Sequence, residues 1–198
     1  MTTDNVNTGR RRFLVGATSV VGAAGAVGVA TPFVASWKPS ARARSAGAPV
    51  RQNISKIEPG AMVTVEWRRQ PVYVVRRSEE MLKLLDSIPA PELKDPNSDN
   101  TGQQPDWAKN DYRSSNPEYL VIKAVCTHLG CAPKFRPELA AADLGADWVG
   151  GFFCPCHGSR FDLAGRVMSG SPAGSNLEVP PYRYEGDVLI VGEDQESA

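Results

Sequence analysis

Two short segments of the chain hold all of its cysteines and histidines. The first reads C-T-H-L-G-C from Cys126 to Cys131, and the second reads C-P-C-H-G-S from Cys154 to Ser159. We call them box 1 and box 2. The protein has 198 residues but only 4 cysteines and 2 histidines, so no other segment can supply a thiolate or an imidazole. This distribution predicts one metal site built from both boxes.

Six such side chains are too many for one tetrahedral metal ion, so they must be divided between ligands and another role. Each box contains one Cys–His pair, and these pairs give the four candidate ligands Cys126, His128, Cys154 and His157. Cys131 and Cys156 remain, one in each box. Two cysteines placed in this way can form a disulfide that joins the boxes.

Two metal centres fit two cysteines and two histidines. Zinc binds such a set tetrahedrally, whereas a [2Fe–2S] cluster of the Rieske type takes two cysteines on one iron and two histidines on the other. The Cys-x-His and Cys-x-x-His spacings and the two left-over cysteines favour the cluster. Gly130 and Gly158 also suit tight loops whose backbone N–H groups point at cluster sulfur atoms. A structural zinc site stays open as the alternative.

The two boxes resemble those of the Rieske iron–sulfur subunit of bacterial quinol–cytochrome c reductases, the cytochrome bc complexes. The segment N-L-E-V-P-P-Y at residues 176–182 resembles the strand that follows the cluster-covering loop in that family. The resemblance implies a mostly β fold, with a Rieske-type antiparallel β-sandwich head and one N-terminal transmembrane helix. The cluster-binding part of the head would span about residues 122–174.

The resemblance also assigns roles to single residues. The four candidate ligands would hold one [2Fe–2S] cluster, the disulfide between Cys131 and Cys156 would clamp the boxes, and the imidazoles of His128 and His157 would hydrogen-bond a quinol and accept its proton. The residues that would tune or shield the cluster are Leu129, Gly130, Gly158, Ser159, Phe161 and Pro172.

Ser159 matches the family pattern, whereas Phe161 and Gly174 depart from it. Ser159 is placed to donate its hydroxyl to a sulfur atom, which favours the reduced cluster. Phe161 stands where high-potential members usually have a tyrosine, and phenylalanine has no donor. We therefore expect a lower potential than in tyrosine-bearing relatives. Gly174 replaces a second proline of the covering loop, which implies a looser loop.

The implied function is the oxidation of a quinol. The subunit would take an electron and a proton from quinol in a cytochrome b pocket and pass the electron to a c-type cytochrome, contributing to proton translocation. The implied partners are cytochrome b and c-type cytochrome subunits in a dimeric complex. The alternatives are a Rieske subunit of another exported oxidoreductase, such as arsenite oxidase, or a Rieske-type ferredoxin. Because 22 basic residues balance 22 acidic residues, no nucleic-acid partner is expected.

The N-terminus predicts export and anchoring. Arg10 and Arg11, followed by Arg12-Phe13-Leu14, resemble the twin-arginine signal that exports folded proteins. Residues 1–12 would stay in the cytoplasm and residues 13–37 would cross the bacterial inner membrane once, a core of about 30 Å. The head would then lie in the oxidising periplasm, which agrees with a disulfide.

The remaining chain predicts a flexible neck over residues 38–52 and a head over residues 53–198. Strands are expected at 62–67, 71–76, 119–125, 148–153, 177–184 and 188–191, with a hairpin at 161–167. A short helix is expected at 78–86 with Ser78 as its N-cap. Residues 90–117 are polar and predict a long surface loop. Residues 132–149, with a helical turn at 139–144, have no predicted role.

Overall fold

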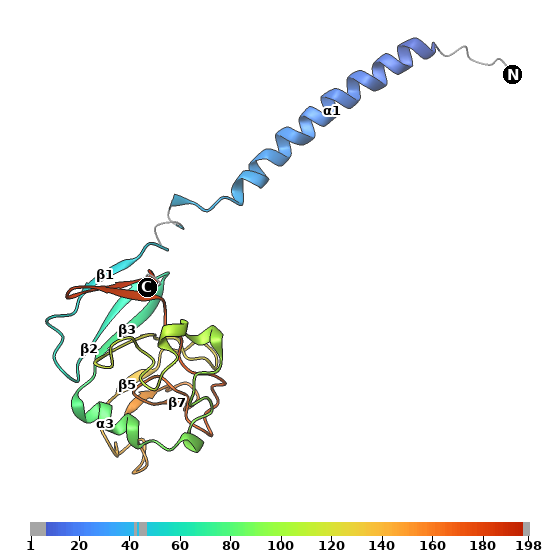
Figure 1. Ribbon diagram of the computed structural model, residues 1–198. Helices are drawn as coiled ribbons and strands as arrows, with labels where there is room; N and C mark the ends of the chain where they lie inside the picture. The colour runs from blue at the N-terminus through green and yellow to red at the C-terminus, as the bar shows by residue number, and fades with distance from the viewer. Residues whose placement is uncertain (1–6, 42, 44–46, 196–198) are drawn as a thin grey trace. The chain divides into compact units, whose positions relative to one another are not determined.

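A computed structural model describes residues 7–41, 43 and 47–195 of the chain (Figure 1). It divides into two units, residues 1–45 and residues 46–198. The first unit carries one long helix, and the second is the head that holds both boxes. The expected neck falls partly outside the described residues.

The N-terminal unit contains α1, which spans Thr8–Ser36 and is 29 residues long. Asn7 caps it, because its side chain accepts a hydrogen bond from the N–H of Arg10. At 1.5 Å per residue the helix measures about 44 Å, so it exceeds the hydrocarbon thickness of a bilayer. It is long and apolar enough to cross a membrane, and it contains the twin arginines within its first turns.

Over the described residues, the head has three antiparallel sheets of three strands each, in the orders β1-β9-β8, β2-β3-β4 and β5-β6-β7. The mostly β, antiparallel fold class is thus confirmed. The strands are β1 Val50–Asn53, β2 Met62–Trp67, β3 Gln70–Arg76, β4 Tyr119–Lys123, β5 Lys134–Arg136, β6 Gly151–Phe153, β7 Arg160–Phe161, β8 Tyr182–Glu185 and β9 Val188–Val191. One α-helix, α3 (Glu79–Ser87), and three short 3-10 helices, η1 (Ala90–Glu92), η2 (Thr101–Gln103) and η3 (Asp106–Ala108), complete the described elements.

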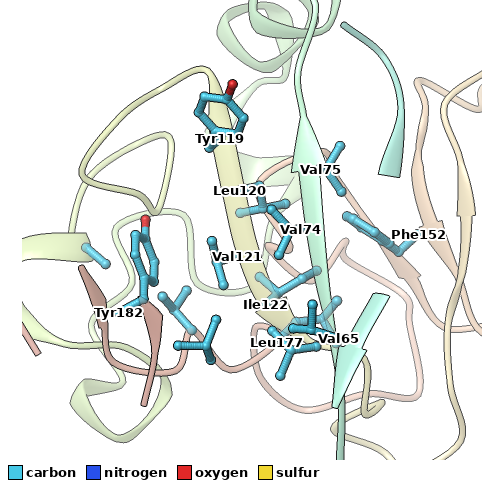
Figure 2. Packing of buried hydrophobic residues seen from close by; sticks show 14 of the residues in the cluster. Val65, Val74, Val75, Tyr119, Leu120, Val121, Ile122, Phe152, Leu177 and Tyr182 are labelled. Atoms are coloured by element: carbon cyan, nitrogen blue, oxygen red, sulfur yellow. The ribbon is translucent and has the colours of Figure 1, made fainter. Parts of the chain in front are cut away.

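The core of the head forms around β4, whose first four residues are all buried. Successive side chains of a strand point to opposite faces, so β4 can contact two layers at once. Figure 2 shows β4 between Tyr182, which comes from β8, and Phe152, which comes from β6. One hydrophobic cluster therefore includes residues of all three sheets, together with Cys126 and Cys154.

Most of the expected elements are present. The strands at 62–67 and 188–191 and the cap of α3 by Ser78 are confirmed, and β3 and β4 differ from expectation only at their ends. The expected strand at 148–153 is regular only over β6, and that at 177–184 only from Tyr182. Residues 50–52, the last part of the expected neck, instead belong to β1 (Val50–Asn53), which pairs with β9.

The expected surface loop at 90–117 is wrong in one respect, because it contributes buried polar residues to the head. Arg113 and Ser98 are fully buried, and Ser114 is nearly so. The guanidinium of Arg113 donates to the carbonyl oxygens of Ala164 and Gly165 and to the side chain of Gln104. Polarity predicted exposure, but these groups are buried because their hydrogen bonds are made inside the protein.

Arg77 makes a similar contact from the end of β3. Its guanidinium donates to the carbonyl oxygens of Pro117, Tyr112 and Leu163 and to the hydroxyl of Ser114. Burial lowers the pKa of Arg77 to about 10, so the group stays protonated at neutral pH. This one side chain ties the long segment 90–117 to the turn that follows β7.

We expect Arg77→Met to destabilise the head by at least about 3 kcal/mol, because several buried acceptors lose their donor at once. The matched control is Arg51→Met, which removes an ion pair with Glu185 whose side chains are 56% and 54% exposed. Such a pair contributes less than about 1 kcal/mol. Chemical denaturation followed by circular dichroism measures both values, and equal losses would contradict the role given to Arg77.

Candidate metal centre

The two boxes fold into loops with the same backbone hydrogen bonds. In box 1 the N–H of Cys126 donates to the carbonyl of Cys131 at 2.7 Å, and the N–H of Gly130 donates back to the carbonyl of Cys126 at 2.9 Å. In box 2 the N–H of Cys154 donates to the carbonyl of Ser159 at 2.8 Å, and that of Gly158 donates to the carbonyl of Cys154 at 2.9 Å.

Glycine occupies the position in each loop where the chain reverses. Gly130 has φ of +84° and Gly158 has φ of +77°, a conformation that other residues adopt only with strain. These two glycines therefore close the loops, which agrees with the expected tight turns, and their own N–H groups donate to carbonyl oxygens rather than to sulfur atoms.

Regular strands position both loops. β4 runs towards box 1 and β5 follows it, while β6 leads into box 2 and β7 starts directly after it. β5 pairs with β6 and β6 pairs with β7, so the strand after box 1 and the strands on both sides of box 2 form one small sheet, whereas β4 belongs to the sheet β2-β3-β4. Cys126 is 2% exposed and Cys154 is 1% exposed. Both thiols thus lie in the hydrophobic core, in reduced form.

The two imidazoles lie together at the surface side of the same site. The rings of His128 and His157 meet edge to face with centroids 4.7 Å apart. His157 is exposed and His128 is half-buried. The Nδ1 atom of His128 is buried and has no hydrogen-bond partner among the described residues. A buried nitrogen without a partner is costly unless it binds something, so this atom is suited to hold a metal.

The structure contains the expected disulfide between Cys131 and Cys156. The sulfur atoms of Cys131, Cys154 and Cys156 lie within 4.8 Å of one another. Because two of these sulfurs are bonded together, only Cys154 of this group can act as a thiolate ligand. The disulfide therefore lies beside the candidate site and joins its two loops covalently.

Burial opposes ionisation of the cysteine ligands when no metal is present. It raises the pKa of the Cys126 thiol, and the neighbouring Cys154 thiol raises it further. The neighbouring amide N–H of His128 and hydroxyl of Ser159 lower the pKa of this thiol, but they do not outweigh burial. A metal centre that carries positive charge would hold both thiolates in this apolar position.

The predicted tuning residues occupy different environments. Ser159 and Phe161 are fully buried, and Phe161 lies opposite Phe152 in the β6–β7 pair. Leu129 is 71% exposed and Pro172 is also exposed, so neither is a residue of the core. Sequence reasoning missed Thr127, whose hydroxyl donates to the carbonyl of Ser175 at 2.6 Å. Nothing in its sequence context marks this contact.

Similarity to known proteins agrees with the geometry. Residues 107–182 match the family described as "Rieske [2Fe-2S] domain", and residues 1–40 match the "Ubiquitinol-cytochrome C reductase Fe-S subunit TAT signal". The ubiquinol-cytochrome c reductase iron-sulfur subunit of Allochromatium vinosum is 58% identical, with 100% of this chain and 95% of its own covered. The subunit of the same name from Blastochloris viridis is 40% identical over 94% of each chain. The mitochondrial cytochrome b-c1 complex subunit Rieske-1 of Arabidopsis thaliana is 44% identical over 71% of this chain and 44% of its own.

The chain belongs to the family of ubiquinol–cytochrome c reductase iron–sulfur subunits. Membership settles three expectations. The protein is a Rieske protein with one [2Fe–2S] cluster, which replaces the zinc alternative. It carries a Tat-type N-terminal signal, and with α1 it is anchored to a membrane. It is a subunit of an oxidoreductase rather than a Rieske-type ferredoxin.

The disulfide predicts a measurable stability of the cluster-binding loops. It closes a loop of 25 residues, for which the chain-entropy model gives about 3.5 kcal/mol. The double variant Cys131→Ser with Cys156→Ser should lose about this free energy of unfolding, measured by chemical denaturation. Wild-type protein treated with a thiol reductant provides the control and should match the variant. Wild-type stability in the double variant would show that the bond does not hold the boxes.

Proposed function

We propose that the four ligands of the cluster are Cys126, His128, Cys154 and His157, and that the site oxidises a quinol and delivers the electron to a c-type cytochrome. The single observation that carries this proposal is the division of the site. Two thiols lie together in the core, and two imidazoles lie 4.7 Å apart at the surface. This donor set matches a cluster with two cysteines on one iron and two histidines on the other.

The bound cluster supplies a one-electron acceptor with a higher potential than all-cysteine clusters, because neutral imidazoles replace two thiolates. The protein's own residues provide the rest of the reaction. His157 is exposed, so a ring nitrogen that does not bind metal can accept the hydroxyl proton of a quinol. The buried Ser159 hydroxyl lowers the pKa of the Cys126 thiol and so stabilises negative charge on its sulfur. His128 contributes the second imidazole, whose ring lies against that of His157.

The exposed residues of box 1 support docking to a membrane-embedded partner. Leu129 follows His128 directly and is 71% exposed, so its apolar side chain is available for contact with a partner. We place it against the partner that forms the quinol pocket, where it would keep water from the cluster. The relatives are named as subunits of ubiquinol–cytochrome c reductase and of the cytochrome b-c1 complex, which supports cytochrome b and a c-type cytochrome as partners. A dimeric complex is part of the same proposal.

The same proposal covers topology. Arg10 and Arg11 direct export of the folded, cluster-loaded protein, α1 is retained as a single-pass anchor in the bacterial inner membrane, and the head lies in the periplasm. The match of residues 1–40 to the Tat-type signal of this family supports it. Residues 38–52 would serve as the neck between anchor and head, although β1 takes up the last part of this range.

Electron paramagnetic resonance on membranes that contain the full chain, reduced with dithionite, tests the proposal. We expect the spectrum of a mixed-ligand [2Fe–2S] cluster, two irons and two acid-labile sulfides per chain, and a change of the spectrum when an inhibitor fills the quinol pocket. Haem of the b and c types should co-purify with the chain. A cluster spectrum without co-purifying b-type haem would instead support another exported oxidoreductase.

The hydrogen-bond donors to the site predict opposite changes of midpoint potential. Ser159→Ala removes the hydroxyl that lowers the pKa of the Cys126 thiol and should lower the potential, whereas Phe161→Tyr offers a hydroxyl at a fully buried position and should raise it. Each change should be on the order of 60 mV, because one such hydrogen bond is worth about a factor of ten in a one-electron equilibrium. Redox titration of the full chain measures both values. Ser87→Ala, which removes an exposed hydroxyl from α3, is the control.

A potential in Phe161→Tyr that stays at the wild-type value or falls would contradict the tuning role of this position. A potential in Ser159→Ala that does not decrease would contradict the tuning role of Ser159.

A further inference from the structure

Residues 170–175 lie over both boxes, and we call them the cover loop. Ala173 is fully buried in the same hydrophobic cluster as Cys126 and Cys154. Its N–H donates to the Ser159 hydroxyl oxygen in box 2 at 3.1 Å. The carbonyl of Ser175 accepts a hydrogen bond from Thr127 in box 1. The position of this loop therefore determines how the site is covered.

A segment far away in sequence supports the stem of the cover loop. Residues 91–95, which we call the bracing segment, run beside residues 167–171. Leu93 and Met168 form an antiparallel bridge. The N–H of Lys94 donates to the carbonyl of Val167 at 3.0 Å, and the N–H of Ser169 donates to the carbonyl of Glu92 at 2.7 Å. The bracing segment precedes residues 107–182, which are those that match the Rieske domain.

The side chain of Lys94 reaches from the bracing segment to the cover loop itself. Its ammonium group donates to the carbonyl oxygen of Ser171 at 2.6 Å and to that of Ala173 at 2.8 Å. These two carbonyls lie on either side of Pro172, which has no N–H. Among the described residues, no other group donates a hydrogen bond to them. One charged group thus fixes both halves of the loop.

Two hydrogen bonds through Ala173 link Lys94 to the Ser159 hydroxyl in box 2. Because Lys94 holds Ala173 in place, the Ala173 N–H stays aligned with the Ser159 hydroxyl oxygen. Because the hydroxyl oxygen accepts this bond, the position of the hydroxyl is fixed beside the Cys126 thiol, whose pKa it lowers. Displacement of the cover loop would release this hydroxyl and admit water to the site.

We propose that Lys94 is a positioning residue of the cluster site, which fastens the cover loop and through it orients the Ser159 hydroxyl. The inference deepens the proposed function, since it assumes that the boxes hold the cluster. It concerns a residue outside both boxes and outside the matched Rieske domain. Lys94 acts only through the loop and does not touch the ligands in the contacts described above.

The test compares four forms of the full-length, cluster-loaded chain. Lys94→Met keeps the aliphatic stem and removes all three donors, whereas Lys94→Arg keeps the charge and several donors. Lys109→Met is the matched control, because Lys109 lies in the same long segment and pairs with Asp99 at 2.9 Å. Wild type completes the set. Two quantities are measured: hydrogen exchange of a peptide that contains residues 170–175, and the midpoint potential.

We expect exchange in this peptide to increase at least tenfold in Lys94→Met and the midpoint potential to decrease. Lys94→Arg should restore both quantities to near the wild-type values, and Lys109→Met should change neither. Wild-type exchange or a wild-type potential in Lys94→Met would overturn the proposal, as would equal changes in the Lys109→Met control. If Lys94→Met does not fold, Lys94→Gln replaces it, because one amide can serve only part of the contact and should give intermediate changes.

The two proposals fail in different ways. Visible absorption reports whether the cluster is present, and quinol oxidation reports the proposed function. Hydrogen exchange reports the cover loop in either case, so a chain that does not oxidise quinol can still confirm or overturn the role of Lys94.

Discussion

With the proposed ligands, the central constraint on this head is that one site must place two thiolates in an apolar interior and two imidazoles at the surface. A buried thiolate is stable only beside positive charge, and burial alone raises the pKa of Cys126. A histidine that exchanges protons with a substrate must be accessible, as His157 is. Both requirements are met only at a boundary of the core. The boxes occupy such a boundary, because strands from the core end where the loops begin.

The two boxes also show how similar loops can carry different chemistry. Their backbone hydrogen bonds are equivalent, so the third and sixth positions of each loop correspond. In box 1 these positions hold His128 and Cys131, and in box 2 they hold Cys156 and Ser159. The disulfide thus joins the sixth position of one loop to the third position of the other. The shift of the histidine by one position, to His157, leaves the third position of box 2 free for this bond.

The sequence predicted the disulfide between the two boxes better than it predicted the frame around them. Ligand chemistry restricted the site to residues of two short segments, and the disulfide followed from the two cysteines that remained. Hairpin strands such as β2 and β3 were also predictable, because they pair with neighbours in sequence. β1 was not, since it is a four-residue strand that exists only through pairing with β9 at the other end of the head. Lys94 was missed for the same reason, because its partners lie 77 and 79 residues away.

The buried arginines show how irregular segments can still be rigid. The long segment 90–117 and the turn after β7 lack regular strand partners for many of their carbonyl groups, and a buried carbonyl without a donor is costly. Arg77 and Arg113 supply donors to both segments at once, and both contact the turn at residues 163–165. Burial lowers the pKa of each guanidinium to about 10, which reports the cost of desolvating the charge. That cost is offset by several charged hydrogen bonds to backbone atoms. Because the turn directly follows box 2 and β7, the two arginines hold the far side of the loop that carries Cys154 and His157.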